Sequence, residues 1–210
     1  PKPEISIEPD FMKEDEESNM RLMAAFGPVG ARVSEELLIN RGILAKPYFK
    51  YAKVEKPQKL FKTTAWQAAY RIGIVEHDSR NNTTVTEAKK AASLGLPVMI
   101  LVQQKAHGVI LLTKLIEAGV HSTFIFGENN QAERQQALNA LKSGEIKALI
   151  GSTILDVGVD VPTVGMVILA GGGKAEVALR QRIGRGLRAK KTGANVCFVV
   201  DFEDGYNNHL

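Results

Sequence analysis

Apolar residues in the second half of the chain form short continuous runs, and helical segments lie between them. Residues 97–102 are such a run, which is typical of a strand buried on both faces. Residues 107–118, ended by Gly119, are predicted to form the helix that follows. Strands that alternate with helices in this way predict a parallel α/β sheet with right-handed crossovers.

The same patterns predict the other elements. Further strands are expected at residues 47–54, 122–126, 148–150, 164–170 and 194–202, and further helices at residues 18–26, 34–42, 64–75, 83–94, 130–142 and 175–182. Open parallel sheets bind ligands beyond the carboxyl ends of their strands, so functional residues are expected in the loops that follow the strands.

Composition is that of a soluble globular protein. Hydrophobic residues make up 44% and charged residues 24% of the 210 residues, and no apolar run approaches the roughly 20 residues of a membrane span. The sole cysteine, Cys197, excludes an intramolecular disulfide, and the first residues lack a secretory pattern. Cytoplasmic residence without a membrane partner is expected, nucleoid-associated or, for a phage-encoded protein, in the host. The net charge of +4 fits a polyanionic partner without indicating one.

Three parts are expected along the chain. Residues 1–18 combine many acidic residues with prolines, as an extended linker does. Residues 19–95 are predicted to be a helical and extended segment that leads into the main sheet. Residues 96–210 carry the regular alternation of strands and helices and are the predicted core.

The most distinctive polar feature is the run Gln181-Arg182-Ile183-Gly184-Arg185-Gly186-Leu187-Arg188. Residues three apart share a helix face, but each glycine weakens a helix by about 1 kcal/mol, so the later arginines are expected to project from a turn. The planar fork of arginine matches phosphate oxygens and suits the charge that develops in phosphoryl transfer. The alternative is a solvated basic helix end.

A second polar loop is predicted after the strand at residues 148–150. The hydroxyl groups of Ser152 and Thr153 can bind phosphate oxygens, although both residues are also typical helix caps. Gly158 allows the backbone to approach a ligand closely, and Asp160 can either accept hydrogen bonds from ribose hydroxyls or belong to a turn.

Together these motifs resemble the C-terminal motor domain of superfamily 2 helicases. Four segments carry the resemblance in the family's order: residues 98–104 as motif IV, Gly127 with Gln131-Ala132-Glu133-Arg134 as the Q-x-x-R helix, residues 152–162 as motif V, and residues 181–188 as motif VI. The resemblance covers residues 97–204. Residues 66–81 look most like DNA-repair and phage-type members of this superfamily.

This resemblance implies a RecA-like parallel α/β fold with helices on both faces, and a nucleotide site shared with a second domain. The 210 residues contain neither a Gly-x-x-x-x-Gly-Lys-Ser/Thr phosphate loop nor an acidic magnesium-binding box. ATP and Mg²⁺ are therefore expected to be bound mainly by an N-terminal RecA-like domain of the same protein, and no metal ligands are assigned here. The glycine run at residues 171–173 is expected to be a flexible strand-end turn. Alone, the chain is expected to be inactive as an ATPase.

The resemblance also implies roles for matching residues. Arg185 and Arg188 would be arginine fingers that reach the γ-phosphate, and Gln181 would orient them or the attacking water. The residues expected to approach the nucleotide are Gly158, Asp160 and Arg182, and those expected on the nucleic-acid track are Gln103, Arg134, Ser152 and Thr153. DNA is the expected nucleic acid.

Two functions from different classes fit these observations. The first is the second motor domain of an ATP-dependent DNA helicase or translocase. The second is a stand-alone, non-catalytic nucleic-acid-binding or regulatory module, which would need no phosphate loop. Arg185 and Arg188 in finger register favour the motor. Motif V departs from many relatives at Ser152, Asp156 and Val157, which leaves the choice between DNA and RNA open.

Overall fold

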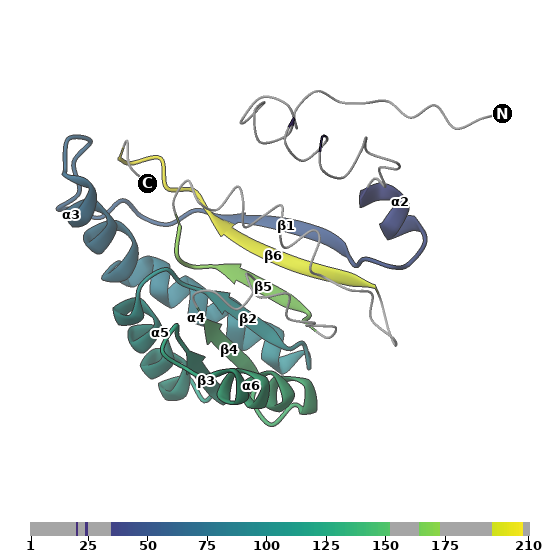
Figure 1. Ribbon diagram of the computed structural model, residues 1–210. Helices are drawn as coiled ribbons and strands as arrows, with labels where there is room; N and C mark the ends of the chain where they lie inside the picture. The colour runs from purple at the N-terminus through teal and green to yellow at the C-terminus, as the bar shows by residue number, and fades with distance from the viewer. Residues whose placement is uncertain (1–19, 21–23, 25–34, 152–163, 173–194, 208–210) are drawn as a thin grey trace.

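The computed structural model of the chain describes residues 20, 24, 35–151, 164–172 and 195–207 (Figure 1). A six-stranded sheet has the order β1-β6-β5-β2-β4-β3, and every neighbouring pair is parallel. Its strands are β1 (Lys46–Ala52), β2 (Val98–Leu101), β3 (Ser122–Ile125), β4 (Ala148–Gly151), β5 (Met166–Leu169) and β6 (Val196–Phe202). The predicted parallel α/β sheet is confirmed.

Helices cover both faces of this sheet. They are α2 (Glu35–Asn40), α3 (Trp66–Tyr70), the π-helix η2 (Arg71–Val75), α4 (Asp78–Ser93), α5 (Lys105–Glu117) and α6 (Gln131–Ser143). α6 packs with Met99 on one face, and α4 and α5 pack with Ile100 on the other. Neighbouring residues of β2 thus enter opposite clusters, as a strand buried on both faces requires. None of the described helices is long and apolar enough to cross a membrane.

The predicted helix ends agree with the structure. A glycine with positive φ follows each of α2, α4, α5 and α6, and these are the predicted stops Gly42, Gly95, Gly119 and Gly144. The predicted helices at residues 18–26 and 175–182 lie outside the described residues, except that Met20 and Ala24 are helical.

The single helix predicted at residues 64–75 is divided into α3 and η2. The amide of Glu76 donates to the carbonyl of Arg71 at 2.8 Å, which closes a wider π turn. Tyr70 and Ile74 are both buried, on the two sides of the junction between α3 and η2. A π turn of this kind cannot be read from apolar spacing alone.

β1 is an edge strand of the sheet. It pairs in parallel with β6 along its whole length, from Lys46 opposite Val196 to Ala52 opposite Phe202. This strand comes from residues 19–95, the segment predicted to lead into the main sheet. The division of the chain at residue 96 stays a prediction.

Gly108 of α5 is a packing requirement that can be tested. A Cβ atom there would lie 2.3 Å from Cζ of Phe124 in β3, whereas a Cβ at Gly127 would meet nothing within 4 Å. We expect Gly108→Ala to lower the free energy of unfolding by about 1–3 kcal/mol through overpacking, although alanine favours helices. Gly127→Ala is the matched control and should leave it nearly unchanged. Urea titration measures both, and a stabilised Gly108→Ala would contradict the packing.

Candidate functional site

The carboxyl ends of all six strands lie at one edge of the sheet because every pair is parallel. We call this edge the carboxyl edge. Gln103 follows β2, Glu128 follows β3, Gly171 and Gly172 follow β5, and Asp204 follows β6. β4 leads into residues 152–163, which lie outside the described residues. The carboxyl edge therefore gathers the loops in which functional residues are expected.

Three side chains hold the chain where it leaves β5. Arg80 of α4 donates from Nε to the carbonyl of Ala170 at 2.9 Å, and the Tyr70 hydroxyl donates to the carbonyl of Gly171 at 2.6 Å. Gln103 donates from Nε2 to the carbonyl of Gly172 at 2.5 Å. The chain turns at Ala170 and Gly171 directly after β5, so the predicted strand-end turn is confirmed, and its flexibility stays a prediction. Gly171 and Gly172 are buried, and partners distant in sequence bind their carbonyl groups.

The guanidinium group of Arg80 is completely buried. It forms an ion pair with the Asp204 carboxylate, and its central carbon lies 4.1 Å from the centre of the Phe202 ring. Burial raises the pKa of Asp204, while the Arg80 charge opposes that rise. Loss of one partner from a buried ion pair leaves an uncompensated charge, which costs about 3–5 kcal/mol. Arg80 therefore supports the β5 and β6 ends together.

Asn81, next to Arg80, is bonded to a buried histidine. Its Nδ2 donates to the carbonyl of Val75 at 2.9 Å, which turns Oδ1 toward His107 Nε2 at 2.9 Å. His107 Nε2 is therefore assigned as the donor. Burial lowers the pKa of His107 to about 3, with a smaller contribution from the Arg80 charge. The imidazole is thus neutral at physiological pH.

The loop between β3 and α6 is closed by its own polar groups. Arg134 donates from Nε to the carbonyl of Asn129 at 3.1 Å and from its terminal nitrogen to that of Gly127 at 3.0 Å. Asn130 and Glu133 form a capping box at the start of α6. The guanidinium of Arg134 is thus engaged with the loop backbone, and its role on a nucleic-acid track stays a prediction.

Lys105 and Glu128 connect the segments that directly follow β2 and β3. We call the segment that directly follows a strand the exit of that strand. Lys105 Nζ lies 2.7 Å from the Glu128 carboxylate and 5.7 Å from the centre of the Phe126 ring. Both charged side chains are more than half exposed. An ammonium group at the first turn of α5 is chemically suited to a phosphate, with Glu128 as a competing partner.

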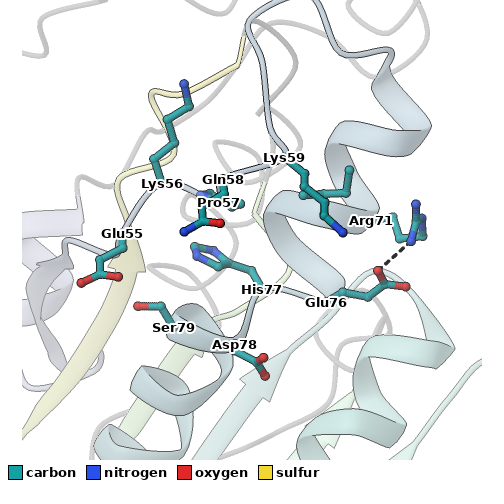
Figure 2. Close-up of a pocket in the computed structure, with 11 residues that line it drawn as sticks. Glu55, Lys56, Pro57, Gln58, Lys59, Arg71, Glu76, His77, Asp78 and Ser79 are labelled. Atoms are coloured by element: carbon teal, nitrogen blue, oxygen red, sulfur yellow. Dashed lines mark hydrogen bonds and ion pairs between the residues drawn. The ribbon is translucent and has the colours of Figure 1, made fainter.

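A solvent-open hollow of about 600 Å³ lies between the segment after β1 and the start of α4 (Figure 2). His77 projects from the start of α4 toward Pro57 and Gln58. Burial lowers the pKa of His77. The charged residues that line the hollow are Glu55, Lys56, Lys59, Arg71, Glu76 and Asp78. Their charges balance, so the hollow has no bias toward a polyanion.

Among the residues that the structure describes, no group of three or more His, Cys, Asp or Glu side chains could hold a metal ion. Beside the carboxylates of Glu128 and Asp204, the carboxyl edge carries the arginine, lysine and carboxamide donors of Arg134, Lys105 and Gln103. Donors of this kind suit phosphate and ribose oxygens.

The family model for the helicase conserved C-terminal domain matches residues 83–190, just over half of the chain. The chain belongs to this helicase family. The matched range includes α5, α6, β2 to β5 and most of α4, together with the segments that carry motifs V and VI. The resemblance to superfamily 2 helicases is confirmed.

A curated relative is the pre-mRNA-splicing ATP-dependent RNA helicase PRP28 of Cryptococcus neoformans, which is 29% identical over 134 residues. The alignment covers 64% of this chain but 18% of PRP28. The chain therefore spans about a fifth of that relative's length.

Solved structures show the RecA-like fold of this helicase domain. T4 UvsW is similar with a TM-score of 0.59 and 22% identity, over 76% of this chain and 32% of UvsW. Dbp5 of Saccharomyces cerevisiae, bound to RNA and ADP BeF3, is similar with a TM-score of 0.56 and 16% identity, over 90% of this chain and 42% of Dbp5. At these identities the likeness concerns the fold.

The structure of this helicase domain describes two of the predicted site residues. Gln103 and Arg134 both lie at the carboxyl edge, at the β2 and β3 exits. The predicted residues that lie outside the described part are Ser152, Thr153, Gly158, Asp160, Gln181, Arg182, Arg185 and Arg188.

Sequence reasoning missed Tyr70, Arg80 and Lys105 as residues of the carboxyl edge. A signal for Arg80 was present, because the buried positions Arg80, Thr84, Ala88 and Ala91 follow helical spacing along α4. The buried face of α4 is apolar at Ala88 and Ala91 and becomes polar toward the start of the helix, at Thr84 and Arg80. Lys105 has no comparable local signal.

The buried His107 predicts that this helicase domain is sensitive to acid. Its pKa is below the unfolded value of about 6.5, so the unfolded state binds more protons between these two pKa values. The neutral His107 therefore does not lower the free energy of unfolding above about pH 6.5. Below that pH it lowers the free energy of unfolding by up to about 1.4 kcal/mol for each pH unit.

Urea titrations between about pH 7 and about pH 5 measure this slope. His107→Gln should make this slope shallower, and His121→Gln, which removes an exposed histidine, is the matched control. Equal slopes in the His107 and His121 variants would contradict a neutral buried His107.

Proposed function

We propose that this chain is the C-terminal motor domain of an ATP-dependent DNA helicase or translocase. The observation that carries the proposal is the run at residues 181–188, which follows the firmly held β5 exit in a chain of the helicase family. The proposal includes cytoplasmic residence, where the nucleic acid of a prokaryotic or phage system is found.

The arginine run gives this domain its part in ATP hydrolysis. Arg185 and Arg188 reach across the cleft to the γ-phosphate, and Gln181 orients them or the attacking water. Arg182, Gly158 and Asp160 approach the nucleotide. Arginine N–H groups donate to phosphate oxygens, whereas Mg²⁺ takes oxygen ligands, so the donor set of this chain fits the phosphates and leaves Mg²⁺ to the other domain.

The other loops of the carboxyl edge give the domain its nucleic-acid track. Gln103 and Arg134 belong to it, together with Ser152 and Thr153 from motif V. Lys105 adds a positive charge two positions after Gln103 in the sequence. Contacts of this kind bind the phosphate backbone independently of base sequence. When ATP closes the two motor domains and hydrolysis reopens them, the different affinities of the two states for the strand produce stepping.

DNA is proposed as the polymer because residues 66–81 resemble repair and phage-type helicases. The name of PRP28 identifies it as an RNA helicase, so RNA is the competing outcome. A stand-alone binding module is the other competing outcome. An ATPase assay of the natural protein with single-stranded DNA, duplex DNA, forked DNA and RNA separates all three.

The finger assignment predicts a loss of turnover without a loss of nucleotide binding. In the natural protein, Arg185→Ala and Arg188→Ala should each lower DNA-stimulated ATP hydrolysis by about a thousandfold or more while ATP still binds. Arg71→Ala removes a more than half-exposed arginine that pairs with Glu76 at 2.7 Å, and it should leave turnover unchanged. Steady-state ATPase and equilibrium ATP binding measure the two effects. Full hydrolysis in both finger variants would refute the assignment.

The track assignment predicts opposite effects of Lys105 and Glu128. Lys105→Ala removes a phosphate partner and should reduce the slope of log affinity against log salt by about 1. Glu128→Gln frees Lys105 from a carboxylate and should tighten binding to single-stranded DNA a few-fold.

Matched controls for these variants lie near the amino ends of the strands. Lys142→Ala and Glu145→Gln make the same charge changes at exposed residues that precede β4 in the sequence. If binding titrations give each control the same effect as its partner variant, the carboxyl edge is not the track.

A further inference from the structure

Gln103 connects the exits of two neighbouring strands. β2 and β5 are paired from Val98 opposite Met166 to Leu101 opposite Leu169, and the amide of Gly171 extends this ladder by donating to the carbonyl of Leu101 at 2.9 Å. Beyond that point the Gln103 side chain continues the connection by donating to the carbonyl of Gly172 at 2.5 Å. The two exits are thus joined first by backbone and then by one side chain.

A glycine at position 171 makes this connection sterically feasible. A Cβ atom there would lie 3.0 Å from the backbone nitrogen of Gln103 and 3.1 Å from its Cγ. An alanine at this position would force the neighbouring atoms of Gln103 to shift by a few tenths of an ångström and so would disturb the bond of its side chain to Gly172. The close approach of the two exits is therefore built into the backbone.

Gln103 differs from the other two residues that hold the β5 exit. Tyr70 and Arg80 have exposed fractions of 3% and 0%, so both are fixed within the core. Gln103 is exposed at the carboxyl edge. Of these three side chains, Gln103 is the one that a ligand at the edge can reach without opening the core.

The chemistry of a carboxamide allows it to serve two partners. The group has two N–H donors and an oxygen with two acceptor sites, and the bond to Gly172 uses one donor. A strand that lies along the edge can therefore accept a second hydrogen bond from the same group or draw the group away from Gly172. In both cases nucleic acid acts on the group that holds the β5 exit.

We propose that Gln103 is a positioning residue that couples nucleic-acid binding at the β2 exit to the β5 exit, from which the chain continues toward the arginine run. This inference rests on the proposed function, because the two coupled ligands are the nucleic acid and the ATP of that function. The carboxamide transmits strand binding to the carbonyl of Gly172, while Tyr70 and Arg80 hold the preceding carbonyl groups in place. Gln103 thereby acts on ATP hydrolysis through the backbone and not by contact with ATP.

The test is a titration of the ATPase rate with single-stranded DNA, in which the maximal rate (the plateau) and the DNA concentration at half-maximal stimulation (the midpoint) are measured. In the natural protein, Gln103→Ala should lower the maximal stimulation by saturating single-stranded DNA about fivefold or more, the usual range of coupling between two sites. Gln104→Ala is the matched control, an exposed glutamine at the next position, and it should reproduce the plateau of the unmodified protein. A role as a simple strand contact would shift the midpoint and restore the full plateau at high DNA concentration, which would overturn the coupling.

Binding measurements provide a second readout. Coupling between two ligands is reciprocal, so a non-hydrolysable ATP analogue should change the affinity of the unmodified protein for single-stranded DNA, and this change should shrink in Gln103→Ala. A change of equal size in both proteins would overturn the proposal. The melting temperature separates the coupling from a structural role, since it should stay close to that of the Gln104→Ala control.

Gly171→Ala tests the same bond from the other side. It should reproduce the lower plateau, and the double variant Gly171→Ala with Gln103→Ala should be no worse than either single variant. Additive losses would show that the two residues act separately and would overturn the proposal. If Gly171→Ala does not fold, Gln103→Ala decides alone. Absence of any stimulation in the unmodified protein would instead overturn the proposed function, and with it the coupling.

Discussion

The buried guanidinium group of Arg80 is the constraint on which the carboxyl edge depends. Taking this charge out of water costs several kcal/mol, which only a full set of partners offsets. Its partners are a carbonyl at the end of β5, the Asp204 carboxylate after β6 and the aromatic ring of Phe202 within β6. These groups come together only when β5 and β6 end side by side beneath α4. One buried charge therefore ties the position of a helix to the alignment of two strands.

The consequence is a fixed support for the segment that leaves β5. The carbonyl groups of Ala170 and Gly171 accept hydrogen bonds from side chains that are themselves buried, so the chain leaves the sheet in one direction. The proposed arginine fingers would need such support, because a guanidinium that meets a phosphate across a domain boundary tolerates little misplacement. The exposed Gln103 is the adjustable member of this otherwise rigid group.

Most of the fold could be predicted because local patterns determine it. The apolar runs of β2, β4 and β5 and the glycines that end the helices are short-range features, and the strings of motifs V and VI identify the family without any structure. Arg80 could not be predicted in the same way, since its partner Asp204 is 124 residues away. The contact of Gln103 with Gly172 spans 69 residues and depends on β2 and β5 being neighbours. Local sequence patterns therefore predict the helices and strands, whereas the contacts of the candidate site depend on the order of the strands in the sheet.

Strand order also explains why Gln103 lies between two proposed ligands. β3, which follows β2 in sequence, lies toward one edge of the sheet, whereas β6, which follows β5, lies toward the other edge, so the order of the strands diverges at these two neighbours. Such a switch point is where open α/β sheets bind ligands. The proposed track extends from the β2 exit over β4 and β3, and the proposed fingers follow β5. β2 adjoins both β4 and β5, so the shortest route between track and fingers runs through the Gln103 carboxamide, whose hydrogen bond can change without any movement of the sheet.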